Sequence, residues 1–169
     1  MANPIVGIVM GSDSDWPLVK KAFDTFKEFG VECEVRVISA HRTPDLAAEY
    51  SKTALERGIK VILSAAGGAA HLGGILAAHT TLPVIGIPVA GGALNGVDAL
   101  LATLQMPSGI PVATVALGSA GPVNAALFAI QILALSDAAL ASKLALHKQK
   151  LAEKVDAANK RVNDEIAKL

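Results

Sequence analysis

The sequence predicts an α/β fold in which helices cover both faces of a parallel β-sheet. Two observations lead to this prediction. Short runs of β-branched and other apolar residues alternate along most of the 169 residues with segments whose apolar residues recur at helical spacing. The inner runs are apolar throughout, which is typical of parallel strands buried on both faces. Such a fold has right-handed crossovers and carries its functional loops at the carboxyl ends of the strands.

The first half of the chain contains two strand and helix pairs. PIVGIVM at 4–10 predicts a buried strand, and residues 16–29 repeat apolar side chains at helical spacing until Gly30 stops the helix. Residues 31–39 alternate apolar and polar side chains, as expected of a half-exposed strand. A second helix begins at Pro44 and is predicted to extend to Arg57.

Three further apolar runs, each followed by a helical segment, complete the predicted sheet at 60–65, 83–89 and 112–117. Residues 143–169 differ from the rest, since they carry seven basic and four acidic residues in a long helical pattern with apolar residues seven apart. We expect this helix to pack on the core or on a neighbouring subunit. The chain is thus predicted to be a single domain over 1–169, with an α/β core to about 136 and a C-terminal helix over about 137–169.

Composition and charge exclude several classes of protein. Lys and Arg total 15 against 15 Asp and Glu, so the sequence predicts no broad basic surface for nucleic acid or anionic lipid. No apolar run is long enough to span a membrane, and the N-terminal residues lack the basic region of a signal peptide. The single cysteine, Cys33, cannot form an internal disulfide. We therefore expect a cytoplasmic protein.

The distribution of charge predicts self-association. Between Lys60 and Asp137 the only Asp, Glu, Lys or Arg residue is Asp98, and this stretch holds 11 of the 15 glycines. A domain of this size leaves roughly a third of its unfolded surface exposed, so a monomer would present a wide apolar face to water. We therefore expect a homo-oligomer in which the Gly/Ala-rich core forms much of the interface.

The first candidate site loop is GSDSDWP at 11–17, between a strand and a helix. The hydroxyls of Ser12 and Ser14 and the free N-H groups of a helix start suit a phosphate, and the Asp15 carboxylate can accept hydrogen bonds from ribose hydroxyls. Helix capping alone is the alternative interpretation, because Ser and Asp before Trp-Pro also make an ordinary cap.

The second candidate loop is SAHRTP at 39–44, and it again joins a strand to a helix. Arg42 supplies a permanent bidentate cation for phosphate. His41 is a side chain that can exchange protons near neutral pH. A lone histidine is more often structural than catalytic, and the place of His41 beside Arg42 at a strand end leaves both interpretations open.

The third candidate loop is AGGAAHLGG at 66–74, where paired glycines let backbone approach a ligand closely. His71 is either a site residue or a histidine at a helix start. The chain has no GxGxxG after its first strand, no GxxxxGK[ST] and no GxSxG, so nicotinamide binding, P-loop chemistry and a serine-hydrolase triad lack their usual motifs. Nor does any set of carboxylates, His or Cys have the spacing of metal ligands.

Taken together, GSDSDW at 11–16, SAHRTP at 39–44, AGGAAHL at 66–72 and QMPSGIPVAT at 105–114 closely resemble the class I N5-carboxyaminoimidazole ribonucleotide mutases of bacterial purine biosynthesis. The resemblance extends to NAALFAIQIL at 124–133. It implies a three-layer flavodoxin-like domain in an octamer with sites at subunit boundaries. It also implies carboxylate transfer from N5 to C4 of a small ribonucleotide substrate, without metal, ATP or biotin, and a transient contact with the ATP-dependent synthase that makes the substrate.

The resemblance also implies roles for individual residues. His41 becomes the general acid and base. The residues that bind the substrate are Ser12, Ser14, Asp15, Ser39, Arg42, Gly68 and His71. In the family's proposed route, protonated His41 helps the N5 carboxylate leave as CO2, C4 attacks the trapped CO2, and His41 then removes the C4 proton.

Three other functions are weighed against this one. Enzymes that carboxylate aminoimidazole ribonucleotide directly with CO2 typically carry Lys at the position of Arg42. Nickel-pincer nucleotide proteins, which share the fold, carboxylate another ring and usually carry an extra N-terminal segment. A receiver-like module would use Asp13 and Asp15, but the chain lacks a phosphoacceptor Asp after its third strand and a Lys after its fifth.

The chain departs from the usual class I pattern at three places near the third loop. Gly73 stands where Pro is common, Ile75 where Met is common, and Ser64-Ala65 where Ala-Gly is usual. Gly73 is expected to loosen the loop beside His71, because glycine is conformationally free. The departures leave the acid/base histidine and the phosphate-binding groups unchanged.

Overall fold

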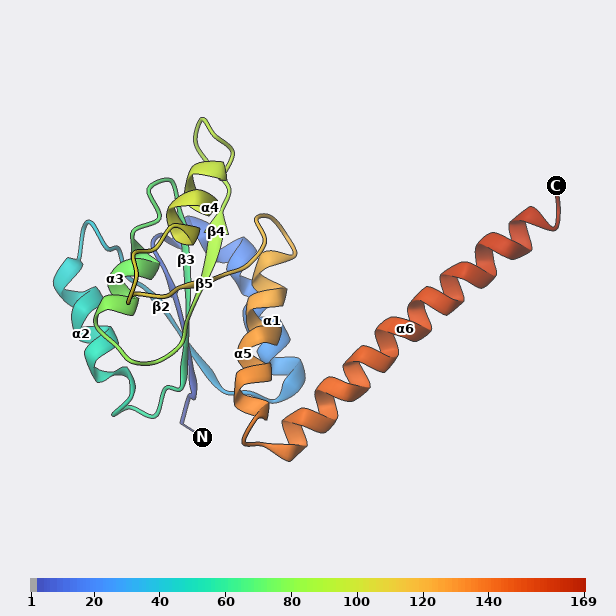
Figure 1. The fold of residues 1–169 in the computed structure, drawn as a ribbon, viewed down its shortest axis with the longest axis horizontal. Helices are drawn as coiled ribbons and strands as arrows, with labels where there is room; N and C mark the ends of the chain where they lie inside the picture. Colours follow the sequence, from blue (N-terminus) through green and yellow to red (C-terminus); the bar gives the residue numbers. More distant parts are fainter. Residues whose placement is uncertain (1–2) are drawn as a thin grey trace. The chain divides into compact units, whose positions relative to one another are not determined.

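The computed structural model describes residues 3–169 and confirms the predicted α/β fold. One sheet of five parallel strands has the order β2-β1-β3-β4-β5, with helices on both sides (Figure 1). This is the flavodoxin-like order. The strands are β1 (Val6–Met10), β2 (Cys33–Val37), β3 (Val61–Gly67), β4 (Val84–Val89) and β5 (Ala113–Thr114). The α-helices are α1 (Trp16–Phe29), α2 (Pro44–Ala54), α3 (Leu72–Ala78), α4 (Val97–Leu104), α5 (Gly121–Ala134) and α6 (Ala138–Ile166).

The inner strands are as apolar and as buried as predicted. Every residue of β1 and β4 is buried, and β3 is buried up to Gly67. β1 lies between β2 and β3, so Val6 pairs with Cys33 on one side and with Val61 on the other. The loops that follow these three strands therefore emerge next to one another.

Several predicted elements differ in length from those observed. β1 begins at Val6 rather than at residue 4, β2 is shorter than the predicted 31–39, and β3 extends past the predicted 60–65 to Gly67. α1 occupies the predicted residues and ends at Gly30, whose φ of 71° gives the left-handed cap that favours glycine. α2 ends at Ala54 rather than Arg57. β5 covers only Ala113–Thr114 of the predicted 112–117, because an edge strand pairs with one neighbour alone and the chain leaves the sheet after Val115 donates to the Gly86 carbonyl.

The chain forms two compact units, one ending at Ile130 and the other covering Gln131–Leu169. The first unit contains the sheet. The second contains the end of α5 and the 29-residue α6, whose first amides are capped by Asp137 through Ala139 N at 2.9 Å and Leu140 N at 3.1 Å. Single-domain organisation and the packing of α6 stay predictions. No helix within residues 3–169 is long and apolar enough to cross a membrane.

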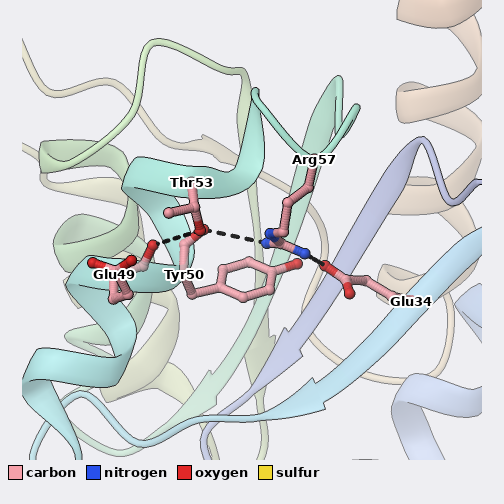
Figure 2. Close-up of polar contacts among 5 residues, drawn as sticks. All are labelled: Glu34, Glu49, Tyr50, Thr53 and Arg57. Atoms are coloured by element: carbon pink, nitrogen blue, oxygen red, sulfur yellow. Dashed lines mark hydrogen bonds and ion pairs between the residues drawn. The ribbon is translucent and has the colours of Figure 1, made fainter.

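A polar cluster ties β2 to the end of α2 (Figure 2). The Arg57 guanidinium lies 4.6 Å from the centre of the Tyr50 ring and forms an ion pair with Glu34. The Tyr50 hydroxyl is buried without a hydrogen-bond partner among the described residues, and this burial raises its pKa. Gly7 of β1 faces the hydroxyl so closely that a Cβ there would collide with it.

We expect Gly7→Ala to lower the free energy of unfolding by about 1–3 kcal/mol, the usual cost of overpacking a core. The Tyr50 ring has little freedom to yield, since the side chain is buried and Arg57 packs over the ring. Chemical denaturation at equal protein concentration measures the change. Gly91→Ala is the matched control, because nothing lies within 4 Å of a Cβ at that position. Equal stability of the two variants would contradict the expectation.

Candidate active site

The loops after β1, β2 and β3 enclose a cavity of about 390 Å³. It lies where the strand order reverses direction, at the carboxyl ends of the strands, which is where open α/β sheets bind ligands. Its walls combine polar and small apolar residues: Gly11, Ser12, Asp15, Ser39, Ala40, His41, Arg42, Ala66, Gly67, Ala70, His71 and Leu72. The three loops singled out in the sequence thus meet at one place.

The first loop both caps a helix and leaves a carboxylate free. Ser12 Oγ accepts hydrogen bonds from the Ser14 amide at 3.3 Å and the Ser14 hydroxyl at 2.8 Å, and so caps the short 3-10 helix Asp13–Asp15. Asp15 precedes α1 but makes no side-chain cap to it. Burial raises the pKa of Asp15, while the Ser14 hydroxyl opposes this rise. Capping therefore accounts for Ser12 and leaves the Asp15 carboxylate facing the cavity.

Side-chain hydrogen bonds stabilise the second loop internally and connect it to the first loop. Ser39 Oγ accepts from the Arg42 amide at 3.1 Å, and Thr43 Oγ1 accepts from the Ser39 amide at 3.1 Å. Arg42 Nη2 donates to the Gly11 carbonyl oxygen at 2.9 Å. This last bond holds the guanidinium beside the serine-rich loop, so the Arg42 cation and the Ser12 and Ser39 hydroxyls line the same cavity.

The third loop turns sharply to bring His71 back over the cavity. Gly68 and Ala70 have φ of 60° and 47°, and the Ala70 amide closes the turn onto the Gly67 carbonyl at 3.1 Å. His71 precedes α3 without capping it. Its Nδ1 lies 2.7 Å from Nε2 of His41, with the two rings edge to face at 79°.

Two residues predicted to bind substrate do not line the cavity. Ser14 is absent from the cavity wall, and its hydroxyl bonds two residues that line it, Ser12 and Asp15. Gly68 serves the left-handed turn, and its neighbour Gly67 lines the wall instead. Sequence reasoning assigned no individual role to the small wall residues Ala40, Ala66 and Ala70, because alanine carries no chemical signal of its own.

The arrangement offers a cation with hydroxyls for a phosphate, a carboxylate for sugar hydroxyls, and a pair of imidazoles for proton transfer beside a small apolar wall. Within the described part of the chain, no group of three or more His, Cys, Asp or Glu side chains could hold a metal ion. The side chains that line the cavity are thus of the types that suit a nucleotide ligand and a reaction with proton transfer.

A family model described as AIR carboxylase matches residues 5–154 of the sequence. The chain belongs to the AIR carboxylase family. It is 60% identical over 142 residues to the N5-carboxyaminoimidazole ribonucleotide mutase of Bacillus subtilis, with 84% of this chain and 88% of that protein covered. It is 53% identical over 162 residues to the enzyme of the same name from Pyrococcus horikoshii, with 96% of this chain and 90% of that protein covered.

A solved structure agrees with the fold. The crystal structure of Treponema denticola PurE matches with a TM-score of 0.84 and 32% identity, covering 94% of this chain and 98% of that one. A segment of the Dictyostelium discoideum bifunctional purine synthesis protein purC/E is 52% identical over 153 residues, 90% of this chain and 15% of that protein. The resemblance predicted from the motifs is confirmed.

The departure at Gly73 gives a stability prediction. Gly73 is the second residue of α3. α1 has a proline, Pro17, at its own second position after the helical Trp16, so this fold already accommodates proline at that position of a helix. A Cβ on Gly73 would meet Val112 Cγ1 at 3.5 Å and Ser64 Oγ at 3.6 Å, which are ordinary contacts. Gly73→Pro should therefore raise the free energy of unfolding by about 0.4–1 kcal/mol, because proline restricts the unfolded chain. A lower free energy of unfolding in denaturant titration would refute this.

Proposed function

We propose that this chain is an N5-carboxyaminoimidazole ribonucleotide mutase, an isomerase of purine biosynthesis that moves a carboxylate from N5 to C4 of the substrate's ring. The observation that carries the proposal is the meeting of Asp15, of His41 and Arg42, and of His71 at one cavity from three separate loops. Relatives that bear this enzyme's name are 50–60% identical to the chain over most of its length.

Different polar side chains of the cavity bind the phosphate and the ribose of the substrate. Arg42, held on the Gly11 carbonyl, binds the phosphate together with the Ser12 hydroxyl and the amides of the first loop. Ser14 and Ser39 support this subsite through their hydrogen bonds to Ser12 and to the Arg42 amide. Asp15 accepts hydrogen bonds from the ribose hydroxyls.

His41 carries both proton transfers. It donates a proton to N5 as the bond between N5 and the carboxylate carbon breaks, which releases CO2 and leaves the free amine. C4 then attacks the CO2, and the proton that C4 loses returns to His41 as the ring regains its aromaticity. One proton is given and one is taken, so the enzyme ends the cycle as it began.

The apolar wall beside the histidines serves the intermediate. Ala40, Ala66 and Ala70 offer CO2 no nucleophile and little room, and Leu72 adds apolar surface next to His71. An apolar wall next to C4 keeps CO2 near its target and replaces a bimolecular encounter with a positioned one.

Direct carboxylation of aminoimidazole ribonucleotide by free CO2 is the second candidate function, since the same pocket would suit it. Purified protein and N5-carboxylated substrate, without ATP or added bicarbonate, separate the two. We expect full conversion to the C4 isomer under these conditions. Product formation only from the uncarboxylated ribonucleotide with added bicarbonate would support the direct carboxylase instead.

We propose that the active form is a homo-oligomer, with an octamer as the expected state. Leu94, Val97, Leu101 and Leu104 recur at helical spacing on and just before α4, and each is about half exposed. This stripe lies in the segment whose only charged residue of the Asp, Glu, Lys and Arg types is Asp98. Sedimentation at micromolar concentration should yield a stable oligomer, and a stable monomer would overturn the proposal.

A further inference from the structure

Two histidines from positions 30 residues apart meet at the candidate active site. Nε2 of His41 and Nδ1 of His71 are 2.7 Å apart, and the ring centroids are 4.9 Å apart. An imidazole nitrogen either donates or accepts, so a hydrogen bond between two of them requires one proton between them. The contact therefore exists only while one of the two facing nitrogens carries a proton and the other does not.

The hydrogen bond between His41 and His71 limits the number of protons that the four ring nitrogens can carry. When both rings are neutral, one proton lies between the facing nitrogens and one outer nitrogen stays bare. One more proton fills that outer nitrogen and leaves the contact intact. A second additional proton would put hydrogen on both facing nitrogens, break the contact and set two like charges side by side. The hydrogen bond between the rings is therefore compatible with one added proton and is broken by a second.

Two other charged side chains share the cavity with the histidines. Arg42 and Asp15 are the other charged or titratable side chains that line the cavity within the described residues. Arg42 follows His41 in the chain and donates to the Gly11 carbonyl, whereas Asp15 belongs to the first loop and accepts from the Ser14 hydroxyl. The direction of His71 is set by the left-handed turn through Gly68 and Ala70.

We propose that His71 is a positioning residue that orients His41 and shares its exchangeable proton, so that the two rings act as one unit with a single proton to give and take. The proposal rests on the proposed function, because the carboxylate transfer needs one proton delivered to N5 and one removed from C4. The pair enters with one extra proton, becomes neutral when N5 is protonated, and regains the proton from C4. No other proton donor is required.

Proton sharing is tested first without substrate. Nitrogen NMR of the full-length protein, labelled in its histidines, follows His41 and His71 against pH. We expect two coupled steps separated by about one pH unit or more, each visible at both rings. In His71→Asn, His41 should titrate in a single step, and the control His79→Asn should keep the coupled steps, since His79 bonds the Ile75 carbonyl outside the cavity. Independent single steps in the parent protein would overturn the proposal.

Positioning is tested by turnover. Asn at position 71 places an amide near the former Nδ1 and keeps the hydrogen bond without exchanging a proton, whereas Leu removes both. We expect kcat to fall about tenfold in His71→Asn and about a hundredfold in His71→Leu, with the acidic limb of the kcat profile altered and KM within about threefold. Equal losses with an unchanged pH profile would overturn the proposal. Absence of mutase activity in the parent protein would refute the proposed function. The substrate-free NMR titration would still test whether His41 and His71 share a proton.

Discussion

Turnover is expected to fall by about ten-thousand-fold or more when His41 is replaced with Asn, because one general acid/base transfer contributes about a hundred- to ten-thousand-fold and His41 serves two. The side chain is exposed at a strand-end loop, and among the described residues its ring forms a hydrogen bond with His71 alone. The variant should therefore fold, keep its oligomeric state and still bind the nucleotide. Steady-state turnover of the N5-carboxylated substrate measures the effect.

Two further variants make the His41 result specific. His41→Gln can reach the position of Nε2 and restore a hydrogen bond to His71, but it cannot exchange a proton, so it should be as inactive as His41→Asn. His79→Asn should keep full turnover, because His79 lies on the far end of α3 and does not line the cavity. If the folded His41→Asn variant retained turnover within a few-fold of the parent, His41 would be a binding residue at most.

Substrate affinity is expected to fall by about 10- to 100-fold in Arg42→Ala, since hydrogen bonds to charged groups are worth about 1.5–3 kcal/mol. The fold should change little, because the guanidinium is exposed and its one hydrogen bond to protein within the described residues is to the Gly11 carbonyl. Calorimetry with the ribonucleotide measures the affinity, and denaturation measures the stability.

Arg42→Lys is the matched variant for this loss. Lysine keeps the positive charge but not the planar fork that binds two phosphate oxygens at once, so its affinity should lie between those of Arg42→Ala and the parent. Unchanged affinity in Arg42→Ala would remove Arg42 from the phosphate subsite. If Arg42→Ala lowered the free energy of unfolding as much as the free energy of substrate binding, the role of Arg42 would instead be structural.

The fold followed from the sequence where side-chain periodicity was strong. The all-apolar run before Gly11 and the helical repeat up to Gly30 predicted β1 and α1 closely. A buried strand is a short continuous apolar run, whereas an amphipathic helix repeats its apolar residues every three or four positions. β5 was predicted too long, since Val112 to Leu117 is apolar whether or not it pairs. A pattern of apolar residues reports burial, and pairing depends on neighbours elsewhere in the chain.

The candidate site was predicted as three loops, and its pairwise geometry was not. Strand-end position sufficed to select Ser12, His41 and Arg42, because parallel strands end at one edge of the sheet. The hydrogen bond between His41 and His71 depends on β2 and β3 flanking β1 and on a left-handed turn at Ala70, a residue type that rarely adopts it. Neither feature leaves a signal in the sequence.

The fate of the transferred carbon tests the central claim most directly. The substrate is prepared with a labelled carboxylate carbon and converted by the purified protein in unlabelled bicarbonate, with the product's C4 carboxylate analysed by mass spectrometry after a single turnover. A site that traps CO2 beside C4 predicts that most of the product retains the label. Product carrying the unlabelled carbon of the solution would contradict carboxylate transfer within the cavity.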